Sequence, residues 1–227
     1  MATLHFRVAT TDDVALIHPL VESAYRGEES KLGWTTEAHL ISGVRIDTAG
    51  LLAKVSDPNG AVLIATCLDD STPQNIPQSR LLVACCEVVR RTPQVAYFGM
   101  FAVSPRRQGG GIGRQVLACA EDYCRQTWGT EKLEMTVISS RQELIEWYRR
   151  RGYEVTGETR PFPFEELAKL NSVPLTDDLR FEVLEKDLTA ASTTETGGKG
   201  SGVSTPLGEV GKGGAAALVA ADLTPRV

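Results

Sequence analysis

Histidines, aromatic residues and long apolar runs are all scarce in this sequence. Three of the 227 residues are histidines and 6% are aromatic. The histidines are scattered near the N-terminus, so we interpret His5, His18 and His39 as structural residues. Because no stretch of about 18 apolar residues occurs, we predict no membrane-spanning helix. The first residues lack a basic segment followed by an apolar one, so we expect no secretory signal and a cytoplasmic protein.

Cysteine is too sparse and too irregularly spaced to predict a covalent or metal-bound framework. The five cysteines form no C-x-x-C pair, and most of them stand within apolar runs. Cys85 and Cys86 are adjacent, so on a strand their side chains would point to opposite faces. We therefore expect reduced cysteines packed as small apolar side chains, with no disulfide and no metal site.

The sequence also lacks an excess of basic residues, since 29 acidic residues outnumber 24 Lys and Arg and the net charge is −5. This balance argues against nucleic acid or an anionic membrane as the main partner, because binding to either needs a basic field. A local basic cluster can still bind one small anionic ligand. From about residue 189 the composition becomes rich in Gly, Ser, Thr and Ala. We predict a domain over residues 1–188 and a disordered tail over residues 189–227.

Strand and helix patterns alternate within the predicted domain. A helix pattern between two apolar strand patterns predicts a parallel pair, whereas the earlier strands are joined by turns and form antiparallel pairs. The fold class is therefore α/β (α+β), with a mixed, mostly antiparallel central sheet flanked by helices. The predicted strands cover residues 4–9, 61–67, 81–90, 95–103, 133–139, 153–157 and 180–186. The predicted helices cover a stretch after Thr10 or Thr11 and residues 35–45, 48–55, 112–128 and 143–151.

The most informative segment joins the strand pattern 95–103 to the helix pattern 112–128. Its residues 108–113 read Gln-Gly-Gly-Gly-Ile-Gly, and Arg106, Arg107 and Arg114 flank them. Glycines let backbone N–H groups turn toward one point, and a helix N-terminus adds unpaired donors and a partial positive charge. Such a turn can bind a pyrophosphate. Glycine count alone fits a flexible surface turn equally well, and neither a Walker P-loop nor a Rossmann fingerprint matches in detail.

Residues 108–113 resemble the Gln/Arg-x-x-Gly-x-Gly/Ala signature of the GNAT acetyltransferases. The preceding VAYFGMFAVSP resembles the fourth strand of that family, and LIEWYRRRGY resembles its last core helix. The likeness covers roughly residues 4–188. The segments GWTTEA, MTVIS and GETRPFPF further resemble a group of uncharacterised microbial GNAT proteins, which does not name a substrate.

The resemblance implies acetyl-CoA as cosubstrate, with no metal. In the family the two strands of the parallel pair splay apart, and the pantetheine arm pairs with the backbone in the gap. Ser140 stands near the place where many relatives have an Asn that touches the cofactor, so we expect Ser140 to contact the cofactor or cap the helix. We expect Arg141 to reach the adenosine 3′-phosphate. The expected cofactor-binding residues are Phe101, Ala102, Val103, Arg107, Gln108, Gly109, Gly111, Ile112, Gly113, Arg114 and Ser140.

The chemistry requires a neutral amine and a proton donor for the departing thiolate. Tyr148 occupies the tyrosine position of the family and is the expected acid; alternatively it is a core tyrosine. Glu87 lies among apolar residues on a strand neighbouring the expected acetyl site, so it is the candidate base, with Glu134 as a weaker rival. The alternative for Glu87 is a residue on the solvent face of an amphipathic strand. The backbone N–H near Ala102 would polarise the acetyl carbonyl.

The acceptor pocket in this family is formed by the first helices and their loop, which here contain Tyr25, Trp34 and Glu37. A carboxylate there would attract an ammonium group, although an ordinary surface loop fits the pattern as well. We expect transfer of acetyl to a small primary amine or amino acid, in a monomer or homodimer. The alternatives are acetylation of a protein N-terminus or lysine, and a non-catalytic acyl-CoA-binding module.

Overall fold

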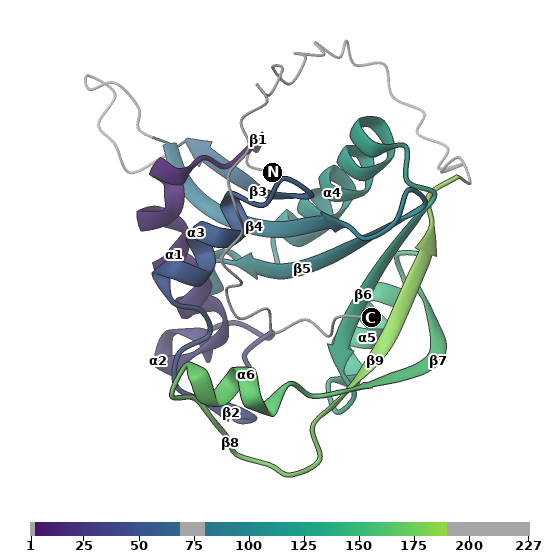
Figure 1. The fold of residues 1–227 in the computed structure, drawn as a ribbon. Coiled ribbons are helices and arrows are strands. Elements are labelled where there is room, and N and C mark those ends of the chain that lie inside the picture. The colour runs from purple at the N-terminus through teal and green to yellow at the C-terminus, as the bar shows by residue number, and fades with distance from the viewer. Residues whose placement is uncertain (1–2, 69–79, 190–227) are drawn as a thin grey trace, which may run out of the picture.

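The computed structural model describes residues 3–68 and 80–189, and a seven-stranded sheet forms its centre (Figure 1). The strand order is β1-β3-β4-β5-β6-β9-β7, and only β5 and β6 are parallel neighbours. A separate two-stranded sheet pairs β2 with β8. The mixed, mostly antiparallel sheet predicted from the sequence is confirmed. The strands are β1 (His5–Val8), β2 (Ile41–Ser42), β3 (Gly60–Leu68), β4 (Arg80–Arg90), β5 (Val95–Val103), β6 (Lys132–Ile138), β7 (Glu154–Pro161), β8 (Val173–Pro174) and β9 (Arg180–Asp187).

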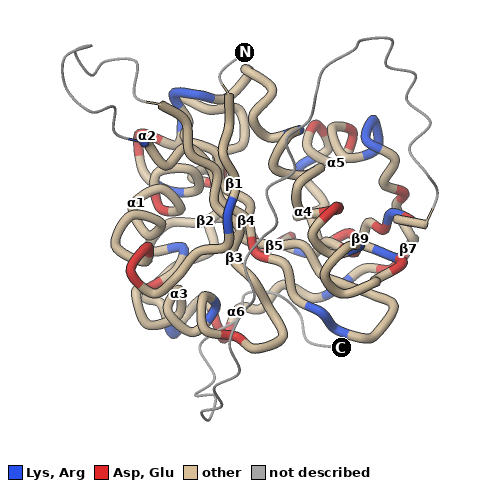
Figure 2. Tube along the Cα trace, turned by 90° about the horizontal axis from the view of Figure 1, so that it is seen from above, with Lys and Arg blue, Asp and Glu red and all other residues tan. Residues whose placement is uncertain are grey.

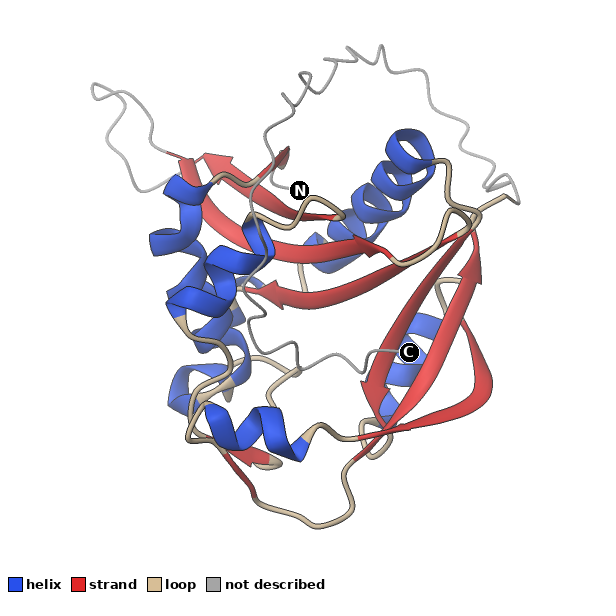
Figure 3. Cartoon of the chain, in the orientation of Figure 1, coloured by secondary structure: helices blue, strands red, loops and turns tan. Residues whose placement is uncertain are grey.

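Helices cover both faces of the large sheet (Figure 3). Helices α1 and α3 pack on one face, and α4 and α5 pack on the other. Asp47 begins α3 by accepting a hydrogen bond from the backbone N–H of Gly50, and Gly129 ends α4 in the left-handed conformation. The helices are α1 (Val14–Tyr25), α2 (Gly27–Ser30), α3 (Thr48–Val55), α4 (Ile112–Trp128), α5 (Gln142–Arg149) and α6 (Phe164–Lys169).

Alternation along the strands divides the core into two layers. In β3, Leu63 packs toward α4 and α5, whereas its neighbour Ile64 packs toward α1 and α3. Cys85 and Cys86 divide in the same way, and both are fully buried. The prediction that the adjacent cysteines point to opposite faces is confirmed.

The sheet is split between its two parallel strands. Residues 95–97 of β5 pair with residues 132–134 of β6, and the ladder between them stops there. On its other side β5 bulges, because Cys85 pairs with Ala102 but Glu87 pairs with Gly99. Met100 in the bulge has a φ of 41°, a strained value for a residue with a side chain, and its buried side chain holds it in the core. The bulge bends β5 away from β6 and opens a gap between them.

The predicted helix over residues 35–45 is wrong. This segment forms turns that lead into β2, and none of its described residues is helical. The Thr36 hydroxyl contacts the Ser30 hydroxyl at 2.7 Å and accepts a hydrogen bond from the backbone N–H of Ala38 at 3.2 Å. Threonine therefore satisfies local groups through a turn and competes with helix formation. Helix α6 and strand β8 were not predicted.

The predicted tail over residues 189–227 lies outside the described residues, apart from residue 189 itself. Along the described chain, basic and acidic residues are interspersed (Figure 2). None of the helices in residues 3–68 and 80–189 is both long and apolar enough to span a membrane.

Candidate functional site

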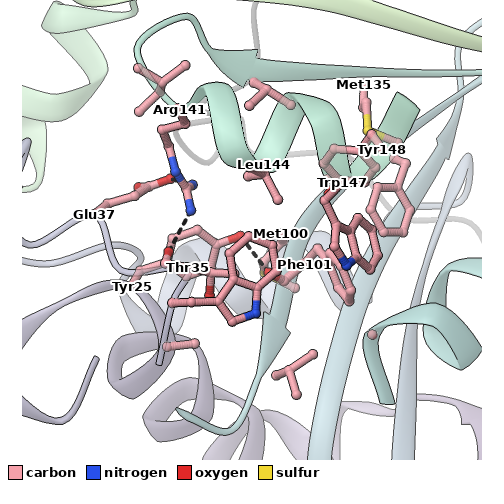
Figure 4. A pocket seen from close by; sticks show the side chains of 18 of the residues that line it. Tyr25, Thr35, Glu37, Met100, Phe101, Met135, Arg141, Leu144, Trp147 and Tyr148 are labelled. Carbon is pink, nitrogen blue, oxygen red and sulfur yellow. Dashed lines mark hydrogen bonds and ion pairs between the residues drawn. The ribbon is translucent and has the colours of Figure 1, made fainter. Parts of the chain in front are cut away.

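A cleft with a solvent-accessible volume of about 250 Å³ begins where β5 and β6 separate. Its walls come from the second half of β5, from β6, from α5 and from the loop before β2 (Figure 4). We call the end beside residues 108–113 the glycine end. We call the end beside Tyr25, Glu37, Arg45 and Arg141 the arginine end.

The glycine end presents backbone rather than side chains. Gly109 and Gly111 both have a φ of 83°, and a Cβ at either position would meet no neighbour within 4 Å. Gly111 is the N-cap of α4, so the first N–H groups of this helix have no partner within the helix. Gly113 faces Phe101 and Trp147, whose ring atoms lie 3.3 and 3.5 Å from the position of a Cβ. A ligand can therefore approach the start of α4 closely.

Two arginines make the glycine end positive. Arg114 and Arg151 both line the cleft, and the Arg151 guanidinium lies 3.5 Å from the centre of the Trp147 ring. Its Nε atom is buried and has no hydrogen-bond partner among the described residues. Burial lowers the pKa of Arg151, and the charges of Arg150 and Arg114 lower it further. Such a crowded group of cations is stabilised by a bound anion.

Beyond the split, side chains instead of a neighbouring strand form hydrogen bonds with backbone carbonyls of β5. The Tyr25 hydroxyl donates to the carbonyl of Phe101 at 2.8 Å (Figure 4). Gln108 Nε2 donates to the carbonyl of Val103 at 3.1 Å and to the Thr35 hydroxyl at 2.9 Å. These contacts satisfy backbone carbonyls that the missing ladder leaves unpaired.

Gln108 also joins two sides of the cleft. Its Oε1 atom accepts a hydrogen bond from the backbone N–H of Trp34 at 3.0 Å. The Trp34 ring in turn lies 6.4 Å from the Trp147 ring of α5. The side chain of Gln108 thus holds the loop before β2 in place, while its backbone remains in the glycine turn.

Tyr148 of α5 points into the cleft with its side chain packed between two aromatic rings (Figure 4). It is 4% exposed, and within residues 3–68 and 80–189 no group forms a hydrogen bond with its hydroxyl. Burial raises the pKa of Tyr148 well above its usual value. The hydroxyl therefore keeps its proton at neutral pH and can donate it to a group bound in the cleft.

The arginine end contains a buried ion-pair network. Glu37 Oε2 lies 3.0 Å from Arg26 Nη1, and its Oε1 lies 2.7 Å from Arg141 Nη1. Burial alone would raise the pKa of Glu37, but Arg141 and Arg26 outweigh it and lower the pKa. Arg141 also donates to the carbonyl of Thr35. Glu37 is therefore an ionised carboxylate at neutral pH, with both oxygens already paired.

Comparison with known proteins decides the family. A sequence model described as the acetyltransferase (GNAT) family matches residues 29–153, which is more than half of the chain. The chain belongs to the GNAT family of acetyltransferases. This family uses acetyl-CoA. A comparison of the sequence with curated proteins gives no match.

Solved structures share the fold of this acetyltransferase at low sequence identity. An N-acetyltransferase from Staphylococcus aureus Mu50 has a TM-score of 0.57 and 14% identity, over 83% of this chain and 99% of that chain. The protein yncA from Salmonella typhimurium, with its cofactor acetyl-CoA, has a TM-score of 0.55 and 16% identity, over 86% and 99%. The spermidine/spermine N-acetyltransferase SpeG from Vibrio cholerae has a TM-score of 0.54 and 15% identity, over 82% and 93%. At these identities the likeness shows the fold alone.

The acetyltransferase places most of the predicted site residues around this one cleft. The residues that line it come from the predicted cofactor, acid and acceptor groups alike. They are Tyr25, Trp34, Glu37, Phe101, Val103, Gln108, Gly109, Gly111, Gly113, Arg114 and Tyr148.

The two candidate bases are not among the residues that line the cleft. Glu87 is 3% exposed on β4, and Lys54 Nζ lies 3.0 and 2.9 Å from its two carboxylate oxygens. Glu134 accepts hydrogen bonds from Arg91 and, through both oxygens, from Arg160. Each carboxylate is therefore held in an ion pair, and the role of either as a base remains a prediction.

Four predicted cofactor residues also lie outside the cleft lining. Ala102 is buried against α1, Ile112 belongs to the core beneath α4, and Arg107 contacts the sulfur of Cys67 at 3.6 Å. Ser140 is exposed and does not cap α5, since Arg141 is the N-cap residue of this helix. The prediction of a Ser140 cap is wrong.

Some residues of the site were predicted in another role or were not predicted at all. Arg141 does not lie where it was expected, because its guanidinium binds Glu37 and the Thr35 carbonyl. Arg45, Trp147 and Arg151 line the cleft but were not predicted as site residues. Trp147 is the neighbour of Tyr148 in the sequence and Arg151 contacts Trp147 locally, whereas the position of Arg45 depends on its long-range contact with Tyr25. Among the described residues, no three His, Cys, Asp or Glu side chains gather as metal ligands.

Proposed function

We propose that this protein transfers an acetyl group from acetyl-CoA to the primary amine of a small molecule, by direct attack in a ternary complex. The observation that carries the proposal is the continuity of one cleft. The separated strands β5 and β6, the glycine end and Tyr148 all line the same space. The spermidine/spermine acetyltransferase among the structural neighbours supports a small amine only as a substrate class.

The residues of the glycine end fit a CoA thioester. Gly109, Gly111 and Gly113 leave room for phosphates against the backbone of the turn, and a Cβ at Gly113 would crowd the cleft. Arg114 and Arg151 supply positive charge, and the buried Nε of Arg151 lacks an acceptor among the described residues. When bound, acetyl-CoA supplies an acetyl group already activated as a thioester.

The cleft then has to orient the amine and supply one proton. The amine enters neutral, its nitrogen forms a bond with the acetyl carbon, and the carbon–sulfur bond breaks. Tyr148 donates its hydroxyl proton toward the departing sulfur, and the nitrogen loses a proton to water in the open part of the cleft. The Tyr148 phenolate then regains a proton from that water, which closes the cycle. Glu87 remains a prediction as base, but its ion pair with Lys54 holds it outside the lining.

The test measures acetyl-CoA binding and thiol release with a broad panel of amines, using the full chain. We expect Tyr148→Phe to bind acetyl-CoA as the wild type does while kcat falls about 100-fold, the lower range for general acid catalysis. Tyr123→Phe is the matched control, because Tyr123 of α4 packs against Trp128 away from the cleft. Its kcat should stay within about twofold of the wild type.

Three outcomes would contradict parts of the proposal. Equal turnover by Tyr148→Phe and the wild type removes the acid role of Tyr148. Binding of acetyl-CoA without thiol release for any amine favours a non-catalytic binding module, and release only with peptides favours a protein N-terminus or lysine as acceptor.

A further inference from the structure

The charge at the arginine end does not suit a polycationic acceptor. Of the charged residues at this end, Arg45 and Arg141 contribute two positive charges to the lining and Glu37 contributes one negative charge. Both oxygens of Glu37 are bound by guanidinium groups, at 3.0 Å from Arg26 and 2.7 Å from Arg141. The expectation that Glu37 attracts an ammonium group therefore fails, because its charge is already neutralised. The end is left with a net positive charge.

Arg45 carries that unbalanced charge. Its guanidinium lies 5.0 Å from the centre of the Tyr25 ring and lines the cleft. Among the described residues, no carboxylate or carbonyl accepts a hydrogen bond from this guanidinium. A planar guanidinium binds a carboxylate through two parallel hydrogen bonds, so Arg45 has the geometry for an anionic group and no partner of its own.

The backbone on both sides of Arg45 is fixed. Glu22 Oε1 accepts hydrogen bonds from the backbone N–H groups of Arg45 and Ile46, at 2.8 and 2.9 Å. The ring of His18 contacts the carbonyl of Ile46 at 2.9 Å. Two residues of α1 thus hold this loop, and the guanidinium projects over Tyr25 from a constrained position. Little conformational freedom remains to be lost when a ligand binds.

Tyr25 connects Arg45 to the reacting end of the cleft. One face of its ring lies beneath the guanidinium, and its hydroxyl is hydrogen bonded to Phe101 of the open β5 edge at 2.8 Å. A small ligand that binds Arg45 through one end therefore extends along Tyr25 toward the split between the strands. Such a ligand has an anionic group at Arg45 and an amine at the split between the strands.

We propose that the acceptor is an amino acid or a similarly small amine that bears a carboxylate, and that Arg45 binds this carboxylate. The inference rests on the proposed function, in which an acetyl group is transferred to a primary amine. A di- or polyamine would instead bring a second positive charge close to Arg45 and Arg141, where it is repelled.

The test compares matched acceptors that differ only at the carboxylate: each standard amino acid, its amide and its decarboxylated amine, with spermidine added. The full chain is assayed as wild type, Arg45→Gln and Arg45→Lys, with Arg125→Gln as the control. Arg125 is exposed on α4, where it pairs with Asp122, and it lies outside the cleft. Binding of each amino acid to the CoA-loaded protein is measured in parallel by calorimetry.

We expect the wild type to prefer amino acids and Arg45→Gln to lower their kcat/KM by about 10- to 100-fold, mainly through KM, since hydrogen bonds to charged groups are involved. Amides and decarboxylated amines should change by less than about threefold, because they make no such contact. Arg45→Lys should restore part of the loss, and Arg125→Gln should match the wild type. The Kd for acetyl-CoA should be the same in all four proteins.

The outcomes separate this inference from the proposed function. Turnover that prefers spermidine or the decarboxylated amines, or an equal loss for all acceptors in Arg45→Gln, overturns the carboxylate site but leaves the acetyl transfer intact. Arg45-dependent binding of amino acids without any thiol release keeps the carboxylate site and overturns the transfer. If the protein neither binds nor acetylates any amino acid, the inference is overturned.

Discussion

Replacing Glu37 with Gln tests the electrostatic account of the arginine end. The side chains of Glu37, Arg26 and Arg141 are 9%, 5% and 12% exposed, so the network is almost fully removed from water. Glutamine keeps the shape of the side chain but removes its charge and presents an N–H group to one of the guanidiniums. Removing one partner of a buried ion pair costs about 3–5 kcal/mol, because the remaining charge stays buried and unpaired. We expect Glu37→Gln to lower the free energy of unfolding by about 3 kcal/mol.

The assay is urea denaturation at neutral pH, followed by circular dichroism. Glu28→Gln is the control, since Glu28 is 88% exposed and pairs with Lys31 on the surface, where an ion pair contributes less than about 1 kcal/mol. Arg26→Gln and the double variant complete a mutant cycle. The double variant should cost less than the sum of the two single changes, because each single change leaves one charge without its partner. A loss below about 1 kcal/mol for Glu37→Gln, or strict additivity, would refute the reasoning.

Two further predictions concern the N-terminal loop and the glycine end. Hydrogen bonds from Arg7 lower the pKa of Asp13 from 3.8 to about 2, so the stability that this pair provides is complete above pH about 4 and is lost as the pH falls toward 2. Because Arg7 is 44% exposed, we expect only about 1 kcal/mol, and acid titrations of unfolding should show this loss in the wild type but not in Asp13→Asn; identical profiles would contradict the assignment. Gly111→Ala places a side chain at a φ of 83°, which costs about 1–2 kcal/mol and should weaken acetyl-CoA binding about tenfold by calorimetry. Gly110→Ala, whose Cβ meets only the Arg107 carbonyl at 3.8 Å, should bind normally, and equal affinities of the two variants would argue against a fixed turn.

Local patterns predicted those parts of the fold that depend on neighbouring residues. The helices over residues 48–55 and 112–128 form as expected, because a capping Asp47 and the glycines at both ends of α4 define their limits. The residues 35–45 were predicted as a helix and form turns. There the side chain of Thr36 and the pairing of β2 with β8 override helical propensity.

The cleft could be predicted only where its residues belong to a motif. The glycine turn and Tyr148 were found in this way, and the split of the sheet followed from the family resemblance. The partners of charged residues were not predictable, because Lys54 reaches Glu87 from 33 positions away and Arg141 reaches Glu37 from 104 positions away. Whether a carboxylate is a free base or half of an ion pair depends on such contacts, and no local pattern reveals them.

The three residue pairs that join β5 to β6 also bear on the stability of the whole chain. The strands on either side of this short ladder form two hydrogen-bonded halves, β1-β3-β4-β5 and β6-β9-β7, which the backbone connects weakly at the centre. A ligand bound between the halves would hold them together, since binding to the native state raises the free energy of unfolding as the ligand concentration rises. If acetyl-CoA binds between the halves as proposed, its depletion would loosen the molecule and expose it to proteases, so the abundance of the protein in a cell would follow the supply of acetyl-CoA.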